Sequence, residues 1–540
     1  MALDAVARKW EVPSYSGGQQ KLQERNQKWI NDDYVKFIRL AEHLIEKNGE
    51  GVLGFITNHG YLDNPTFRGM RWHLLNTFDK LYVLDLHGNS KKKEITPEGL
   101  PDKNVFDIQQ GVAILIGVKK KCDAKAKTPK PLAQVFHAEL WGDRAGKYES
   151  LFAASLTGTM WQQLQPPAPQ YALTRRDYEQ LDSYEMGFGL NKFMPVHGNG
   201  VVTKRDALNI QSSEDGVREV LRDFINRTES EVRAKYKLPP DVRDWRYEWA
   251  KKDVVDNHQT SPIARIQYRP FDQKFIFYSG NARGLVGWPV KQVMGHYTAG
   301  DNIGLLTTKA VRDRDFAHAF VTKNITEAIF LSGTTGSNAM NFPLYLYPNE
   351  QDLDKKRRIN FDHALYAKLQ DLATDPERGA PNEVAVFDYI YGVLHRPNYR
   401  STYAEFLKID FPRIPWPASP AEFWATADLG GQLRRLHLLE PKAVGTAPYP
   451  FKGDGTGVVE QHRCAEGRIW INSTQYFDAV PSVSWDFYIG GYQPAQKWLK
   501  DRKGCTLSFD DIKHYQRILK VLAETDLLMQ KLDSCTGLLS

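Results

Sequence analysis

The chain has 540 residues, a formal net charge of +6 and an isoelectric point near 8.8. Hydrophobic residues make up 41% and charged residues 25%, a composition typical of a soluble multidomain protein, which excludes a disordered chain. No apolar run reaches the ~18–20 residues of a membrane span, so we expect no transmembrane helix. The mild positive charge permits a polyanionic partner without requiring one.

The four cysteines (Cys122, Cys464, Cys505 and Cys535) lie far apart and form no CxxC pair. Because no histidine stands at ligand spacing from them, we expect neither a disulfide scaffold nor a metal site. Residues 1–20 lack an apolar secretory core, and we therefore expect a cytoplasmic protein.

The first part of the chain alternates helices with buried strands, the pattern of an α/β fold. Asn31 or Asp32 precedes a predicted helix over Asp33–Glu46, with apolar residues at helical spacing. Val52–Ile56 is typical of a parallel strand that ends in the polar loop Thr57–Gly60. Asn64 and Pro65 begin a second predicted helix. Two more buried strands are expected at Leu81–Leu86 and Val112–Val118.

After Leu156 the strands become shorter and the regular alternation is lost. Ile263–Tyr278 is typical of a hairpin, and further short strands are expected up to Leu346. Helices are expected over Asn382–Leu394, Ala421–Leu439 and from Ser508, where Asp511 completes a capping box. We place the domain boundary at 155/156, with a possible second break near residue 350.

Several long segments resemble the Type ISP family, the single-polypeptide, Type I-like restriction–modification enzymes with an N6-adenine DNA methyltransferase. They include VPSYSGGQQ, GFITNHGYLDNPTFRGMR, FDKLYVLDLHGNSKKKE, NVFDIQQGVAI, HAFVTKNITEAIFLS and FDYIYGVLHRPNYRSTYAEFLKIDFPRIPWP. The resemblance runs from Tyr15 almost to the last residue. It implies a partial Rossmann-like methyltransferase sheet in residues 1–155 and a mixed α/β target-recognition region in residues 156–540.

The family's methyltransferase motif is Asn/Asp-Pro-Pro-Tyr/Phe, which supplies acceptors for the two N–H groups of adenine N6 and a ring that stacks on the flipped base. The matching tetrapeptide here is Val12-Pro13-Ser14-Tyr15. Tyr15 corresponds to the stacking ring and Pro13 to the carbonyl acceptor. Val12 departs from the pattern because it has no side-chain acceptor, and Ser14 replaces the second proline.

The family binds S-adenosylmethionine mainly through strands that precede this motif, and only 11 residues precede Val12 here. We therefore expect the chain to contain the second half of a methyltransferase domain and to bind the cofactor weakly or not at all by itself. A partner chain with the missing half is a further expectation.

The resemblance also implies roles for residues in the rest of the chain. Asn58 is expected to line the cleft, and Phe106 to contact the flipped base on the side opposite Tyr15. A core aromatic at the entry to a strand is the alternative for Phe106, and structural roles are expected for His59, His73 and His87. In the target-recognition region, the expected contacts to duplex DNA are Arg269, Lys274, Arg283, Lys291, Arg312, Arg314, Lys497, Arg502 and Lys503. The alternative for each of them is a solvated surface residue.

The chain has no GxxxxGK[ST] segment, so the ATP motor of full-length relatives is not expected in it. Two functions from different classes stay open. The first is an adenine-N6 DNA methyltransferase in truncated form, and the second is a non-catalytic DNA-binding specificity module.

Overall fold

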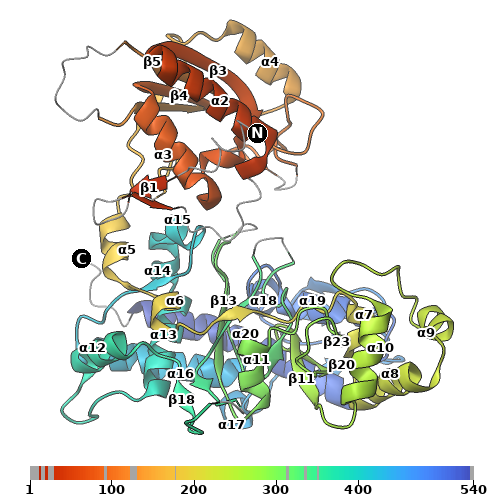
Figure 1. Cartoon of the computed structure of the whole chain (residues 1–540). Helices are drawn as coiled ribbons and strands as arrows, with labels where there is room; N and C mark the ends of the chain where they lie inside the picture. Colours follow the sequence, from red (N-terminus) through yellow and green to blue (C-terminus); the bar gives the residue numbers. More distant parts are fainter. Residues whose placement is uncertain are drawn as a thin grey trace. The chain divides into compact units, whose positions relative to one another are not determined.

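The computed structural model describes residues 11–13, 19–21, 30–90, 94–121, 131–168, 170–176, 178–311, 315–333, 337–349 and 352–534. The chain divides into two compact units, Met1–Tyr178 (unit 1) and Glu179–Ser540 (unit 2). The two units divide at 178/179, later in the chain than the predicted boundary at 155/156, and the second break near residue 350 stays a prediction. Figure 1 shows both units.

Unit 1 combines strands with three longer helices in its described part. The strands are β1 (Glu11–Pro13), β2 (Gln19–Lys21), β3 (Gly51–Asn58), β4 (Lys80–Asp85), β5 (Val112–Lys119), β6 (Gln134–Glu139) and β7 (Gln162–Leu164). The helices are α2 (Asp33–Asn48), α3 (Arg68–Thr77) and α4 (Arg144–Ala153), with the 3₁₀ turns η2 (His59–Leu62) and η3 (Pro65–Phe67).

The main sheet of unit 1 has the strand order β3-β5-β4-β6-β7 within the described residues. β5 is antiparallel to both of its neighbours, and β4 is parallel to β6. The prediction of a parallel strand at Val52–Ile56 is therefore corrected in one respect: β3 pairs only with the antiparallel β5 in the described part of the chain. Its other edge has no strand beside it there, and its Val52 and Ile56 are 68% and 51% exposed.

Helices cover one face of this sheet and part of the other, and the side chains of each strand alternate between the two faces. On one face, Leu81 and Val83 of β4 share a core with residues of α2 and α3. On the other face, Leu84 packs with Leu151 of α4. The predicted apolar face of α2 is only partly correct, because Phe37 and Leu44 are more than half exposed.

The segment after β7 belongs to unit 1 because it packs against this core. The Leu173 side chain is fully buried in the cluster formed with α2 and α3. The buried guanidinium of Arg71 donates to the carbonyl oxygens of Tyr61, Asn64 and Gln170 at 2.6–2.9 Å. These contacts join residues 170–173 to the core of unit 1.

Unit 2 contains many short strands, as expected after Leu156. They are β8 (Phe188–Gly189), β9 (Gly198–Asn199), β10 (Ile210–Gln211), β11 (Ile263–Arg269), β12 (Asp272–Phe277), β13 (Gly304–Thr307), β14 (Ala319–Thr322), β15 (Ile325–Thr326), β16 (Met340–Pro343), β17 (Tyr345–Leu346), β18 (Arg358–Ile359), β19 (Arg413–Ile414), β20 (Phe451–Lys452), β21 (Arg463–Ala465), β22 (Arg468–Trp470) and β23 (Tyr476–Phe477). The larger sheets have the orders β10-β12-β11-β15, β14-β13-β16-β9 and β20-β23-β22-β21. The predicted hairpin is confirmed as the antiparallel pair β11–β12.

The helices of unit 2 gather mainly in its second half. They are α5 (Leu181–Met186), α6 (Leu190–Phe193), α7 (Asp206–Asn209), α8 (Glu214–Asn226), α9 (Glu229–Lys235), α10 (Tyr247–Asn257), α11 (Lys291–Thr298), α12 (His363–Ala373), α13 (Glu383–His395), α14 (Pro397–Thr402), α15 (Ala404–Leu407), α16 (Pro420–His437), α17 (Pro441–Val444), α18 (Ser482–Asp486), α19 (Pro494–Lys500) and α20 (Phe509–Ser534).

Helices α13 and α16 approach closely because Gly430 has no Cβ. A Cβ at this position would overlap the Asp388 carbonyl oxygen. The capping box predicted for α20 is confirmed: Asp511 N donates to Ser508 Oγ at 3.1 Å, and Ser508 N donates to Asp511 Oδ2 at 3.0 Å.

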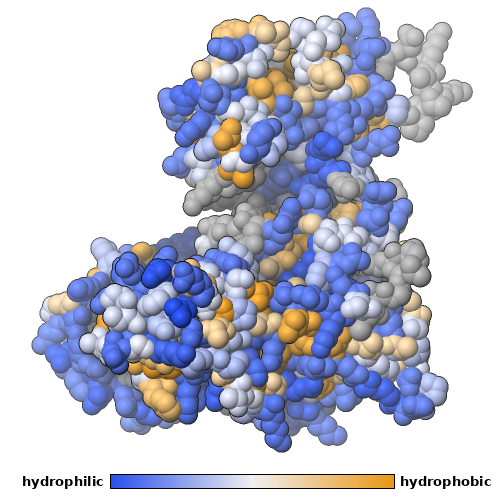
Figure 2. Space-filling view, turned by 180° about the vertical axis from the view of Figure 1, so that it is seen from behind, coloured by the Kyte–Doolittle hydropathy of each residue, from blue (hydrophilic) through white to orange (hydrophobic). Residues whose placement is uncertain are grey.

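The surface in Figure 2 is mostly hydrophilic, with apolar patches on both units. Within the described residues, no helix is long and apolar enough to cross a membrane.

Candidate functional site

Residues that the sequence singled out meet at one end of the unit 1 sheet, where β3 and β4 finish. This end is called the sheet edge below and is distinct from the unpaired side of β3. β3 and β4 end at this edge and β5 begins there, because Asn58 pairs with Val112 and Asp85 with Ala113. The half-buried side chain of Asn58 accepts a hydrogen bond from Gly60 N at 2.8 Å and caps η2. Asn58 therefore lies at the predicted edge with its carboxamide oxygen fixed by the turn.

Phe106 lies in the long loop between β4 and β5. Hydrogen bonds hold its backbone in place, and its side chain is exposed to solvent. Its amide donates to Asn104 Oδ1 at 2.8 Å, and its carbonyl accepts from Arg144 Nη2 at 3.0 Å. The neighbouring Val105 carbonyl accepts from Tyr148 at 2.9 Å. The Phe106 side chain is 41% exposed, so it is not the core aromatic of the alternative interpretation.

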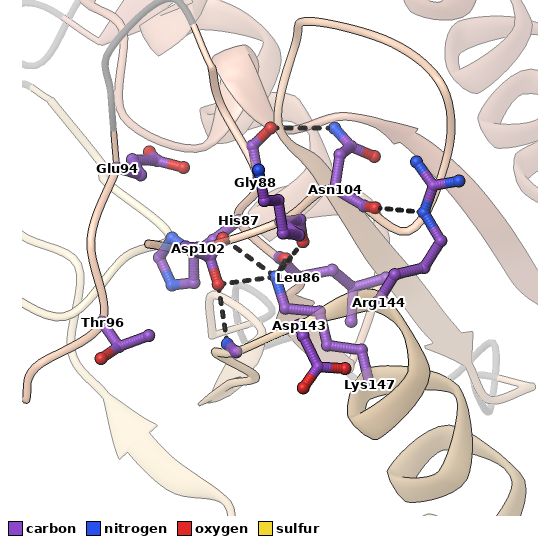
Figure 3. Close-up of polar contacts among 12 residues, drawn as sticks. Leu86, His87, Gly88, Glu94, Thr96, Asp102, Asn104, Asp143, Arg144 and Lys147 are labelled. Carbon is purple, nitrogen blue, oxygen red and sulfur yellow. Dashed lines mark hydrogen bonds and ion pairs between the residues drawn. The ribbon is translucent and has the colours of Figure 1, made fainter. Parts of the chain in front are cut away.

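The loop is anchored by a buried lysine that the sequence analysis did not identify (Figure 3). Lys147 Nζ of α4 donates to the carbonyls of Leu86 and Lys103, each at 2.7 Å, and pairs with Asp102 at 2.8 Å. Both charged side chains are completely buried. A buried ion pair holds its geometry only with such additional hydrogen bonds.

Asn104 connects the two ends of the same loop. Its Nδ2 donates to the carbonyls of Gly88 at 3.1 Å and Gln110 at 2.6 Å, and its own carbonyl accepts from Arg144 Nε at 2.9 Å. Gly88 has a left-handed φ of 81°, and a Cβ there would overlap the Asn104 backbone. The loop is thus tied both to itself and to α4, which fixes the backbone that carries Phe106.

Two of the histidines expected to be structural converge on one carboxylate at this edge. His59 Nδ1 donates to Asp85 Oδ1 at 3.0 Å, and His87 Nδ1 lies 3.9 Å from Asp85 Oδ2. Burial opposes ionisation of Asp85, but the hydrogen bond from His59 and the charges of both histidines hold its pKa below the usual value.

The tetrapeptide Val12-Pro13-Ser14-Tyr15 is only partly described. The backbones of Val12 and Pro13 lie in β1, which pairs antiparallel with β2. Ser14 and Tyr15 lie outside the described residues, and so do Arg312 and Arg314 of unit 2. The roles expected for these four residues stay predictions.

The structure places Arg269 inside unit 2, which corrects its interpretation as a DNA contact. Its guanidinium pairs with the buried Glu327 at 2.7 Å, and the residue is only 5% exposed. Burial raises the pKa of Glu327 to about 7 in spite of this partner. Arg269 thus stabilises the packing of β11 against β15, and a phosphate cannot reach it in this arrangement.

Lys274 and Arg502 line a cleft of about 810 Å³ in unit 2. Arg502 pairs with Asp272 at 2.9 Å, and Lys274 Nζ lies over the Tyr268 ring at 4.2 Å. Lys497, on the nearby α19, pairs with Asp501. Because Asp272 and Asp501 also line the cleft, its basic groups are largely neutralised.

Among the described members of the predicted set, the exposed basic residues are Arg283, Lys291 and Lys503. Arg283 lies over the indole of Trp249 at 5.3 Å from the ring centroid, and the exposed Arg246 lies over the same indole at 5.0 Å. Two solvent-facing arginines on one indole give the combination of cation and aromatic surface that nucleic acids contact.

Residues 192–531 match the family model described as the Type ISP C-terminal specificity domain. The chain belongs to the Type ISP specificity-domain family. This confirms the family identified in the sequence for its target-recognition region, and the mixed α/β fold is confirmed as well. A search of curated proteins finds no match.

Three solved structures share the fold of this Type ISP chain. The ATP-dependent Type ISP restriction–modification enzyme LlaBIII bound to DNA is 20% identical, with a TM-score of 0.72 over 98% of this chain and 35% of that one. The DrdV–DNA complex is 20% identical, with a TM-score of 0.67 over 95% of this chain and 52% of that one. A nuclease-deletion mutant of the Type ISP enzyme LlaGI, in complex with a DNA substrate mimic, is 19% identical, with a TM-score of 0.65 over 95% and 41% of the two chains. The chain spans between about a third and a half of these solved relatives.

Proposed function

We propose that this chain recognises a DNA sequence through its Type ISP specificity domain and contributes the base-binding half of an adenine-N6 methyltransferase site. The main observation in support of this proposal is Phe106. Its aromatic ring is exposed to solvent, and hydrogen bonds hold the backbone of its loop in place at the sheet edge. Methyl transfer to an exocyclic amine needs the target base out of the helix and held between flat surfaces.

Each residue of the proposed pocket has a distinct task. Tyr15 stacks on one face of the extruded adenine and Phe106 contacts the other, while the Pro13 carbonyl accepts one N6 hydrogen. Asn58 lines the same edge of the sheet. The donor of the methyl group is S-adenosylmethionine, as the resemblance to the family implies.

The edge of β3 supports the proposal that further strands complete the cofactor site. In the described part of the chain, this eight-residue strand pairs only with β5, and its Val52 and Ile56 are exposed. We propose that strands from outside residues 1–540, in the same or a partner chain, pair with this edge. Calorimetry should then find weak or no binding of S-adenosylmethionine to this chain alone, and micromolar affinity would contradict this part of the proposal.

Binding to duplex DNA is the first experimental test. Phosphate contacts should dominate, so affinity should fall steeply with salt, at a log–log slope of about −0.9 per phosphate contacted. Electrophoretic shifts at several salt concentrations, with the full chain and with residues 179–540, measure this slope. If neither protein shifts DNA at low salt, the proposed recognition function fails.

The base pocket is tested in an enzyme restored with the missing strands. Phe106→Ala and Tyr15→Ala should each weaken binding of an extruded base by about 1–3 kcal/mol, the typical value of base–aromatic stacking. Phe152→Ala is the matched control, because Phe152 is an 87% exposed aromatic of the same unit. Val12→Asn should raise the methylation rate by restoring the lost acceptor, and no gain would contradict the alignment of the tetrapeptide.

A further inference from the structure

A second cluster at the same sheet edge has no task in base binding. His59 follows β3 directly, Asp85 is the last residue of β4, and His87 comes two residues later. All three are buried. The prediction of no metal site depended on the spacing of the cysteines. The fold instead brings together two histidines and a carboxylate that are separated by up to 28 positions in the sequence.

The distances within this cluster suit a shared cation. One possible ligand atom from each residue lies within 4.8 Å of the others. Asp85 directs Oδ1 toward His59 Nδ1 at 3.0 Å and Oδ2 toward His87 Nδ1 at 3.9 Å. Donors that bind one zinc ion at about 2.0–2.2 Å lie roughly 3–3.5 Å from each other in a tetrahedron. Small side-chain adjustments would therefore bring all three to one ion.

An outer-shell carboxylate orients one of the two imidazole rings. His87 Nε2 faces Glu139 Oε1 at 3.4 Å, and a carboxylate behind a metal-ligating histidine fixes its ring and raises its basicity. His59 Nε2 lies 3.4 Å from Asn89 Nδ2. The Glu139 side chain is 38% exposed, so the cluster borders on solvent and an ion could enter from there.

The backbone around the cluster is shaped for these rings. His87 has a left-handed φ of 51°, and its amide donates to Asp85 Oδ1 at 3.0 Å. Its ring stacks on Trp141, with centroids 3.3 Å apart. A Cβ at Gly111 would overlap the His59 ring, so only glycine fits there. The positions of both histidines are therefore imposed by the fold.

We propose that His59, Asp85 and His87 bind one divalent transition-metal ion of the zinc class, with Glu139 as the orienting residue. Two imidazoles select such an ion over Mg²⁺ or Ca²⁺, which prefer oxygen ligands. The bound ion would join the chain segments that follow β3 and β4. Because protons compete with the ion for the imidazole nitrogens and the carboxylate, binding should weaken as the pH falls.

The test uses the full chain after treatment with a chelator. Titration with Co²⁺ should give one equivalent with the visible absorption of a low-symmetry site, and Zn²⁺ should displace it. His59→Ala and His87→Ala should each weaken binding by at least about tenfold, the lower limit for loss even of an outer-shell partner. His43→Ala is the matched control, because His43 is exposed on α2 of the same unit.

X-ray absorption of the Zn²⁺-loaded wild-type chain makes the test independent of how well the variants fold. The expected spectrum contains two imidazole ligands and oxygen. No stoichiometric binding at micromolar concentration would overturn the proposal and leave a metal-free hydrogen-bonded network. Sulfur ligands, or unchanged binding in both histidine variants, would overturn it too. None of these measurements depends on DNA, so the proposed recognition function is tested separately.

Discussion

The two units bury cationic side chains for different purposes. In unit 1, Lys147 is fully buried and holds a polar loop whose exposed aromatic, Phe106, faces solvent. In unit 2, the buried Arg269 and the partly buried Arg434 pair with Glu327 and Asp388 inside the packed elements themselves. A buried basic residue can therefore assist ligand binding only when a ligand can reach its charged group or a residue that it holds in place.

The largest effect should follow from removing the buried cation of unit 1. Lys147→Met leaves Asp102 buried without its partner, which should reduce the free energy of unfolding by about 3–5 kcal/mol. The loop should also lose its anchor and with it the position of Phe106. Chemical denaturation measures the change, and Lys103→Met is the control, because that side chain is exposed in the same loop. Equal effects of both variants would contradict the anchoring role.

A comparable loss is expected in unit 2 from Arg269→Met. The uncompensated Glu327 should reduce the stability of unit 2 by about 3–5 kcal/mol. At temperatures where the variant is folded, its DNA affinity and the salt dependence of binding should stay unchanged. A reduced salt slope in a folded variant would instead make Arg269 a phosphate contact.

Glu42 of α2 should make the stability of unit 1 depend on pH. Burial raises its pKa to about 7, although Arg39 and Thr77 bind the carboxylate. The folded state keeps the proton longer than the unfolded state, so stability is full below the ordinary pKa and is lost as the pH rises to about 7.

The change amounts to about 3 kcal/mol, at 1.36 kcal/mol per pKa unit. Glu42→Gln should remove this loss, so the difference between variant and wild type should grow across that pH range. Urea denaturation at several pH values measures it. Glu46→Gln, one turn along the helix at a more exposed position, should show a much smaller change.

The smallest effect is expected at the exposed arginines of unit 2. Arg283→Ala should leave stability unchanged but weaken DNA binding uniformly across sequences and reduce the salt slope by about 1. The double variant with Arg246→Ala should reduce the slope by about 2. Unchanged slopes would mean that the Trp249 patch lies outside the DNA interface.

The sequence predicted elements whose signals are local. The strands β3, β4 and β5, the β11–β12 hairpin and the capping box of α20 depend on short apolar runs and on neighbouring residues. The expected roles of Phe106 and Asn58 come from the resemblance to a family and stay predictions. β6 and α4 were missed, because a lysine-rich stretch separates β6 from β5 and no strong periodicity marks either element.

The anchor and the metal-ligand cluster could not be predicted in this way. Lys147 meets Leu86 and Asp102 from 61 and 45 positions away, and His59 meets Asp85 from 26. Nothing in a single sequence shows which lysine is buried or which histidines converge. Arg269 illustrates the same limit, since its sequence context is also that of an exposed basic residue.

The uncovered edge of β3 also has a consequence for handling the protein. An eight-residue strand that pairs on one side only within the described residues, and whose Val52 and Ile56 are exposed, is a template on which other chains can add strands. Concentrated preparations of this chain should therefore self-associate and precipitate despite its net charge of +6. Covering this one edge should therefore reduce self-association.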